Sequence, residues 1–362
     1  MSVSFQFRRH ALETLLGGVS PLDLSRISVE SMDEACGLLH NYGYDWNNEE
    51  DKKQLWSIYQ KALVFLKSEM MTDEDKIPDP IGDFNQFKEL PQLLMFASEK
   101  NGASLDLRRW SCALLKAMHV IVHFSHDMYS IFPDEIKKQI LGPIETYLHS
   151  DPVVGSTFLR QSSQQESVKL YKFEQKPVKD FRSSIVKLLA KRKLIALNLY
   201  DNIGVRFVTW NTFDCFRVAR FLMKNTLVSS LQGINDQAVN SIYPVNLFLE
   251  VMDNLRTKAD DLEAAEIEAL LAKKLAEHGE RAEYLTKDNH FSGESFRFMK
   301  FVCRKLVRVN VNGVDHRFFY PFEVQIMTKD AYLESIQGDQ AHHEYKARQK
   351  QAARRRLFGI TE

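Results

Sequence analysis

The sequence predicts an α/β protein of the α+β type, in which a mixed β-sheet flanked by helices follows an all-α region. Apolar residues recur at three- and four-residue spacing through residues 1 to about 155, as in amphipathic helices. Residues 318–328, FFYPFEVQIMT, alternate with a period of two, as in a strand. We therefore expect a helical N-terminal domain over 1–155 and a mixed-sheet domain over 156–362.

Length and composition fit this division and exclude several classes of protein. The 362 residues are enough for two domains that each bury a core. Lys plus Arg and Asp plus Glu number 48 each, so the overall charge selects no partner. No apolar run reaches membrane-spanning length and the N-terminus lacks a signal-peptide core, so we expect a cytoplasmic protein with no membrane contact. No CxxC pair is present, which argues against a zinc site and a secreted disulfide scaffold; the cysteines are Cys36, Cys112, Cys215 and Cys303.

The N-terminal region contains two strongly periodic segments, 52–70 and 107–132, separated by the Pro- and Gly-containing break KIPDPIGDF. In the second segment His119, His123 and Asp127 follow one another at four-residue spacing, which places them on one helical face. His and Asp together can bind a metal ion. The alternative is that these are satisfied core histidines of a helical regulatory or scaffolding domain, and we favour it.

The second half of the sequence changes character. Residues 177–193, PVKDFRSSIVKLLAKRK, predict a basic amphipathic helix whose apolar stripe contains Ile185, Leu188 and Leu189. Residues 196–210, ALNLYDNIGVRFVTW, are rich in β-formers and predict a strand, and 214–225 fit the helix that follows. The segment 256–283 is strongly helical with mixed charge.

Two strand-like runs flank Asn312-Gly313, a dipeptide typical of a two-residue β-hairpin turn. The stretch FFYPFEVQIMT is then the second arm of a long antiparallel hairpin, with its even positions, Phe318 to Ile326, facing the core. Its odd face carries Glu323 and Gln325 in a stretch with few other polar residues. Either that face is exposed to solvent, or it belongs to a functional site. A final helix is expected from about residue 329.

Two further groups of residues suggest phosphate chemistry. The basic helix repeats polar residues every fourth position, which forms a stripe that can hold phosphates or can simply be solvated; these residues are Lys179, Ser183, Lys187 and Lys191. Asp201 stands at a strand end, where a carboxylate is a common Mg²⁺ ligand but also an ordinary turn residue. The tail KARQKQAARRRLFG is basic, which fits either a solvated helix end or a contact with RNA or a nucleotide.

The order and the sequences of these segments resemble those of one known family. FEVQIMT followed by GDQAHHEYK resembles the EVQIRT…GxAAHWxYK signature of the RelA/SpoT-type nucleotide pyrophosphokinases, the alarmone synthetases. YDNIGVRFV resembles the strand D-[IL]-x-[AG]-[VL]-R-[IV] of that family, and VKDFRSSIVK resembles its K-x(3)-S-I-x-x-K helix, with Ile185 one position late. The resemblance covers about 176–346, roughly half of the chain.

The resemblance implies a nucleotidyltransferase-like synthetase domain that transfers pyrophosphate from ATP to the ribose 3′-hydroxyl of GDP or GTP, making an alarmone such as (p)ppGpp. It implies that Mg²⁺ is a cofactor, bound by Asp201 and Glu323, with Glu323 alternatively the general base. The ATP-binding residues implied, with Arg206 alternatively a structural partner for a carboxylate, are Lys179, Ser183, Lys187, Arg192 and Arg206. The acceptor-binding residues implied are Gln325, His342, Lys287 and Phe291.

The sequence departs from the family at EYLTKDNHFSGESFRF, where the PK dipeptide of the family is missing. Glu294 stands where the family has the tyrosine that stacks on the acceptor guanine, and a carboxylate offers no stacking surface. The acceptor is therefore GDP or GTP, an adenosine nucleotide, or the 3′ end of an RNA. A catalytically weakened nucleotide-binding regulator is the rival from another class, and the presence of both Asp201 and Glu323 argues against it. The sequence leaves the oligomeric state open.

Overall fold

The computed structural model of the chain resolves into two compact units, each described here by itself. Unit 1 comprises 1–127, 179–199 and 346–362, and unit 2 comprises 128–178 and 200–345. The structure describes residues 16, 20–23, 28–83, 87–125, 128–151, 156–161, 167–176, 181–190, 200, 202–255, 262–286, 297–337 and 339–359, apart from the side chains of 21, 337 and 339–344.

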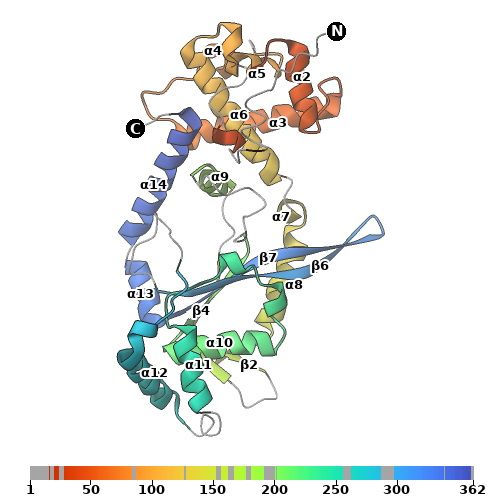
Figure 1. Ribbon diagram of the computed structural model, residues 1–362. Helices are drawn as coiled ribbons and strands as arrows, with labels where there is room; N and C mark the ends of the chain where they lie inside the picture. Colours follow the sequence, from red (N-terminus) through yellow and green to blue (C-terminus); the bar gives the residue numbers. More distant parts are fainter. Residues whose placement is uncertain are drawn as a thin grey trace, which may run out of the picture. The chain divides into compact units, whose positions relative to one another are not determined.

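Unit 1 is helical and has its own apolar core (Figure 1). Helices α3 and α6 supply much of that core, and α3 ends in a π-helical turn, η2. The apolar stripe predicted for the basic helix is confirmed, because Ile185, Leu188 and Leu189 of α9 are buried in this core. The elements of unit 1 are η1 (Pro21–Asp23), α2 (Met32–Asn41), α3 (Glu49–Phe65), η2 (Leu66–Met70), α4 (Asp79–Gly82), α5 (Gln92–Ala97), η3 (Glu99–Asn101), α6 (Leu105–Ser125), α9 (Phe181–Ala190) and the later turns of α14 (Asp339–Phe358).

Two arginines of the basic C-terminal segment are used inside unit 1. Arg356 is nearly buried, pairs with Asp23 through two hydrogen bonds of 2.6 and 2.9 Å, and donates to the carbonyls of Leu188 and Leu189 at the end of α9. A cation at this position also interacts favourably with the negative end of the helix dipole. Arg354 pairs with Asp75 at 2.7 Å. These arginines therefore hold the C-terminal helix to the N-terminal helices.

The two predicted histidines of α6 contact a tyrosine and each other. The Tyr42 hydroxyl lies 2.7 Å from His119 Nδ1, and the rings of His119 and His123 meet edge to face. Burial, reinforced by His123, lowers the pKa of His119 to about 4, so this imidazole is neutral at pH 7. Asp127 lies outside the described residues. His119 is half-buried and His123 is exposed, so neither is a buried core residue, and the expected core role is wrong for His123.

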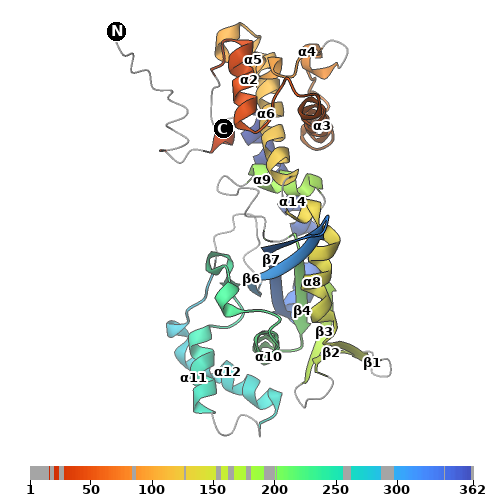
Figure 2. The same cartoon turned by 90° about the vertical axis from the view of Figure 1, so that its right-hand side faces the viewer.

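Unit 2 is built on a seven-stranded mixed sheet in the order β1-β2-β3-β4-β7-β6-β5 (Figures 1 and 2). Only β4 and β7 are parallel among the described pairs, from Gly204 beside Glu323 to Thr209 beside Thr328. The predicted mixed sheet is thereby confirmed. The strands are β1 (Leu148–Asp151), β2 (Ser156–Arg160), β3 (Ser167–Gln175), β4 (Gly204–Thr209), β5 (Val239–Asn240), β6 (Met299–Val311) and β7 (Val314–Thr328).

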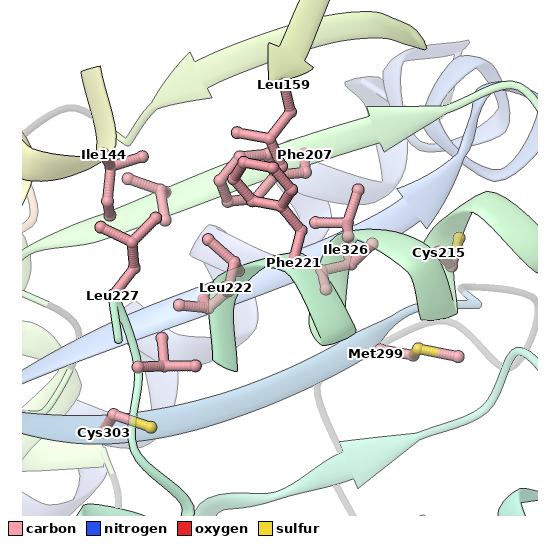
Figure 3. Close-up of a cluster of buried hydrophobic side chains, with 14 of the residues drawn as sticks. Ile144, Leu159, Phe207, Cys215, Phe221, Leu222, Leu227, Met299, Cys303 and Ile326 are labelled. Carbon is pink, nitrogen blue, oxygen red and sulfur yellow. The ribbon is translucent and has the colours of Figure 1, made fainter. Parts of the chain in front are cut away.

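One face of this sheet forms the core of unit 2. Phe207 of β4 and Ile326 of β7 pack with Phe221 and Leu222 of α10 (Figure 3). The even face of β7 is buried from Tyr320 to Ile326, as predicted. The helices and short turns of unit 2 are α7 (Met128–Ile131), α8 (Pro133–Glu145), α10 (Thr212–Lys224), η5 (Ser230–Gln232), η6 (Asn235–Gln237), α11 (Val245–Asn254), α12 (Ala264–His278), η8 (Gly279–Arg281), α13 (Lys329–Gln337) and the first turns of α14.

Several predicted boundaries differ from the structure. The meander β1–β3 was not predicted, and β1 falls inside the expected all-α region 1–155. The boundary at residue 155 falls inside unit 2, because α8 packs on the sheet while α9 and the end of α14 pack in the helical core of unit 1. The expected final helix is two helices, α13 and α14. None of the described helices is long and apolar enough to cross a membrane.

The predicted hairpin is present, with β6 and β7 paired from Met299 beside Ile326 to Val311 beside Val314. Asn312 and Gly313 form its turn with φ of 52° and 84°, a left-handed conformation that glycine adopts without steric cost.

Gly313→Ala should therefore lower the free energy of unfolding by about 1–2 kcal/mol, because it forces a Cβ into the left-handed region. Gly37→Ala is the matched control, since Gly37 lies in α2 with nothing within 4 Å of its added Cβ. The control should stabilise the chain by about 0.5–1 kcal/mol. Urea unfolding of both variants measures the two effects, and equal shifts would contradict the assigned turn.

Asp75→Asn tests the ion pair that holds the C-terminal helix. The hydrogen bond from Arg354 holds the pKa of Asp75 at about 2, below its ordinary value of 3.8. A lowered carboxyl pKa stabilises the fold above about pH 4, and the effect is lost as pH falls toward 2. The variant should lose up to about 2 kcal/mol at pH 7 and nothing near pH 2. Urea unfolding across this pH range measures the loss, with the exposed Asp73→Asn as the control. A loss of stability that did not change with pH would contradict the ion pair.

Candidate functional site

The second face of the sheet carries polar side chains in a register that brings them side by side. Glu174 of β3 lies opposite Arg206 of β4, which lies opposite Gln325 of β7, which lies opposite Lys300 of β6. Side chains that pair directly across strands point to the same face and lie about 5 Å apart. One row of polar groups therefore crosses four strands.

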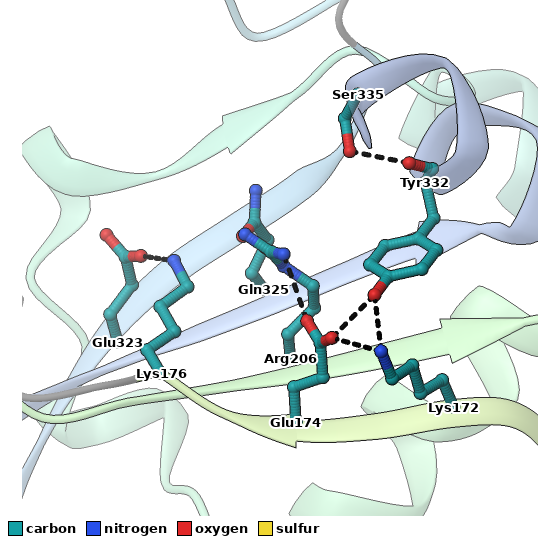
Figure 4. A network of polar contacts seen from close by, with 8 residues as sticks. All are labelled: Lys172, Glu174, Lys176, Arg206, Glu323, Gln325, Tyr332 and Ser335. Carbon is teal, nitrogen blue, oxygen red and sulfur yellow. Dashed lines mark hydrogen bonds and ion pairs between the residues drawn. The ribbon is translucent and has the colours of Figure 1, made fainter. Parts of the chain in front are cut away.

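Glu174 is the centre of a connected network within this row (Figure 4). Its carboxylate accepts from Arg206 at 3.1 Å, from Lys172 at 2.7 Å and from the Tyr332 hydroxyl at 2.5 Å. Burial raises the pKa of Glu174, but the hydrogen bonds from Lys172 and Tyr332 outweigh it, so the pKa lies below its ordinary value. Arg206 donates to Gln325 Oε1 at 3.0 Å as well, so its guanidinium is fixed between two strands.

A β-bulge lets β3 contribute to this face. The β3–β4 register shifts between Leu170 and Lys172. Leu170 is buried in the core, whereas Lys172 and Glu174 point to the polar face. Without the extra residue the alternation would turn these two side chains toward the core.

Glu323 lies in the adjacent row and is only 6% exposed. One of its oxygens accepts from Lys176 (Figure 4). The other lies 3.5 Å from Lys300 Nζ. The Lys176 chain reaches Glu323 across Gly204, where a Cβ would stand 2.9 Å from Lys176 Cδ. Burying an ionised carboxylate is costly unless it is paired and hydrogen-bonded. The glycine is thus the reason that one strand can provide a cation for a carboxylate two strands away.

The odd face of β7 is therefore buried at Glu323 and Gln325, and the solvent-exposed interpretation is wrong for these two residues, since Gln325 is only 4% exposed. The described part of the network contains four cations and two carboxylates, and so carries an excess of two positive charges; the cations are Lys172, Lys176, Arg206 and Lys300, and the carboxylates are Glu174 and Glu323. Lys172 and Arg206 are partly exposed, so the charge is accessible at the surface.

The structure brings together three of the predicted site residues, Glu323, Gln325 and Arg206. Ser183 is exposed and Lys187 half-buried on α9, which belongs to unit 1. His342 falls in α14, and its side chain is outside the described residues. The other predicted residues also lie outside the described residues; they are Asp201, Lys179, Arg192, Lys287 and Phe291.

Five residues of the network were not predicted: Lys172, Glu174, Lys176, Lys300 and Tyr332. Three of them belong to the stretch SVKLYKFEQK, in which Lys172, Glu174 and Lys176 alternate with other residues. This alternation was the available signal for a strand with a charged face. Nothing in the sequence signals the role of Tyr332, which reaches Glu174 from the next helix, α13.

The described residues by themselves do not form a metal site. In that part of the chain no three His, Cys, Asp or Glu side chains gather as metal ligands. Both oxygens of Glu323 face lysine ammonium groups, and a divalent cation would have to displace them. The second predicted ligand, Asp201, is outside the described residues.

Comparison with known proteins gives low similarity throughout. No protein-family profile and no curated protein matches this sequence. Among solved structures, the chain is similar to the small alarmone synthetase 1 from Bacillus subtilis, with 14% identity over 63% of this chain and 86% of that chain, at a TM-score of 0.29. A GTP pyrophosphokinase family protein from Streptococcus pneumoniae gives 16% identity over 64% and 85%, at 0.28. The Bacillus subtilis enzyme bound to its product pppGpp gives 13% over 52% and 72%, at 0.27. Similarity at this level establishes no activity for the chain.

Gly204→Ala should displace Lys176 from Glu323 and lower the free energy of unfolding by about 1–3 kcal/mol, the cost of leaving a buried polar group short of a partner. The same substitution in a Lys176→Met background should cost clearly less, because the crossing side chain then lacks its ammonium group. A double-mutant cycle by urea unfolding measures the coupling. Equal costs in the two backgrounds would contradict the role assigned to Gly204.

Proposed function

We propose that this protein transfers pyrophosphate from ATP to the ribose 3′-hydroxyl of a nucleotide acceptor, as in synthesis of a (p)ppGpp-type alarmone. In this reaction the 3′-oxygen attacks the β-phosphorus of ATP. The bond from that phosphorus to the oxygen bridging the α- and β-phosphates breaks, AMP leaves, and the hydroxyl proton passes to a base. The enzyme is then a nucleotide pyrophosphokinase.

The observation that carries the proposal is Glu323, a buried carboxylate in a sheet face rich in cations. It lies on the strand whose sequence resembles that of the alarmone synthetases. Phosphoryl transfer requires little covalent chemistry from the protein, and depends on positioning and on neutralising phosphate charge. The excess positive charge around Glu323 is of the sign that a polyphosphate requires.

Each described residue then has a role that its contacts support. Lys300 and Arg206 are placed to bind phosphate oxygens, and Gln325 orients Arg206 through the bond of 3.0 Å. Glu323 is the base that accepts the hydroxyl proton, once phosphates draw Lys176 or Lys300 away from its oxygens. The connected hydrogen bonds of Glu174 keep this face rigid before the substrate arrives.

The remaining assignments belong to the same proposal and rest on the resemblance of the sequence. Lys179, Ser183, Lys187 and Arg192 bind ATP, and Gln325, His342, Lys287 and Phe291 contact the acceptor. Mg²⁺ is the proposed cofactor, with Asp201 as a ligand and with Glu323 as the second ligand in the alternative to its role as base. The ion would supply further charge neutralisation of the phosphates. The acceptor is GDP or GTP, with an RNA 3′ end as the alternative.

Glu323→Gln should reduce pyrophosphate transfer about 10²–10³-fold, because it removes a charged group that accepts the proton. The fold should stay intact, because glutamine has nearly the same shape as glutamate. The assay follows the label from [γ-³²P]ATP, with Mg²⁺, to GDP, GTP, ADP or tRNA offered separately. Glu280→Gln is the matched control, since Glu280 is 69% exposed in the same unit. Unchanged transfer by Glu323→Gln, or no transfer by the wild type to any acceptor, would refute the proposal.

A further inference from the structure

The β6–β7 hairpin continues beyond the polar face as a two-stranded ribbon. β4 pairs with β7 only from Glu323 onward, so 314–322 have no β4 neighbour. A two-stranded ribbon is marginally stable alone and needs a covered face. Here the covered face packs on α7 and α8, with Tyr129 stacked on Tyr320 at 6.0 Å and Gln139 bonded to the backbone of Arg308 (Figures 1 and 2).

The opposite face of the ribbon, here called the outer face, is exposed. Its cross-strand pairs, from the polar site toward the turn, are Arg304 with Pro321, Leu306 with Phe319 and Arg308 with Arg317. The three arginines are exposed, and Leu306 and Phe319 are 37% and 51% exposed. On β7 the next residue of this alternation after Pro321 is Glu323, whose β6 partner is the buried Val302, and Lys300 lies one step further along β6.

This arrangement costs stability as it stands. Like charges directly opposite each other destabilise a sheet, as Arg308 and Arg317 do. Among the described residues these two arginines and Arg304 have no carboxylate partner, and the nearby Asp315 is bonded to Asn310 at 2.7 Å. A ligand that brings both negative charge and flat apolar groups would satisfy the arginines and cover Phe319.

We propose that the outer face of the β6–β7 ribbon binds single-stranded nucleic acid. Its phosphates contact Arg304, Arg308 and Arg317, and a base stacks on Phe319. A cationic track interleaved with an exposed aromatic is the combination that binds such strands without sequence preference. Arg304 and Arg308 are four positions apart on β6, about 13 Å along the strand, so the track spans more than one nucleotide.

One end of the track lies near Glu323, and the direction of the bound strand follows from the proposed function, on which this point rests. Pro321 and Glu323 are two residues apart, about 7 Å along β7. A strand lying on the ribbon would therefore present its terminal ribose to Glu323, which makes an RNA 3′ end the acceptor class that this surface favours. The C-terminal arginines Arg354 and Arg356 are already engaged in ion pairs within unit 1.

The test is fluorescence anisotropy of a labelled 15-nucleotide single-stranded RNA with the full chain. The triple variant Arg304→Gln, Arg308→Gln and Arg317→Gln should bind at least about tenfold more weakly at low salt. Its slope of log affinity against log salt should fall by about 2, since each phosphate contact contributes about 0.7. Phe319→Ala should weaken binding roughly 5- to 100-fold through lost stacking. A control triple variant removes the same charge from exposed lysines elsewhere, Lys53, Lys100 and Lys273, and should bind as the wild type does.

Absence of RNA binding, or equal affinity in the two triple variants when both are folded by circular dichroism, would overturn the proposal. Self-association of the wild type that is lost in the arginine variant, measured by sedimentation, would assign the face to a second copy and also overturn it. The proposed function fails separately: RNA binding that depends on the arginines, together with no pyrophosphate transfer to any acceptor, would leave the surface standing and refute the activity.

Discussion

The parallel pairing of β4 with β7 is the constraint on which the rest of unit 2 depends. It sets Gly204 beside Glu323 and Arg206 beside Gln325. A shift by one residue would turn Glu323 and Gln325 into the apolar core and bring Val324 to the polar face. The alternating burial of Val324 and Ile326 against α10 therefore fixes the site as firmly as any polar contact does. Parallel pairing also requires the long connection that contains α10, α11 and α12.

Burying a carboxylate at the centre of a sheet creates a problem that the neighbouring strands solve. Lys176 and Lys300 approach Glu323 from β3 and β6, on opposite sides of the β4–β7 pair. The missing side chain at Gly204 opens the path for Lys176. Replacing such pairs by apolar residues would often be neutral for stability, so their presence is better explained by function. The resulting face is rigid, positively charged and partly accessible, which suits the binding of phosphate groups.

The sequence predicted those parts of the fold whose signals are local. The turn at Asn312-Gly313 requires left-handed backbone, the even face of β7 alternates cleanly, and the stripe of α9 has helical spacing. The meander β1–β3 escaped prediction because β1 and β2 have only four and five residues, and because the bulge at Tyr171 separates the alternation of the core residues of β3 from that of its charged residues. For that reason the partners of Glu323 and Arg206 could not be named. Which unit α9 and the end of α14 join depends on contacts between residues far apart in sequence, such as Arg356 with Asp23, and no local pattern encodes them.

A crystal structure of the chain with a non-hydrolysable ATP analogue tests the central claim most directly. If the polar face of β3, β4, β7 and β6 is the phosphate site, the triphosphate will lie within hydrogen-bond distance of Arg206 and of Lys176 or Lys300, with the β-phosphorus next to Glu323. A triphosphate bound elsewhere on the chain, with the Lys176–Glu323 and Arg206–Glu174 pairs unchanged, would contradict it.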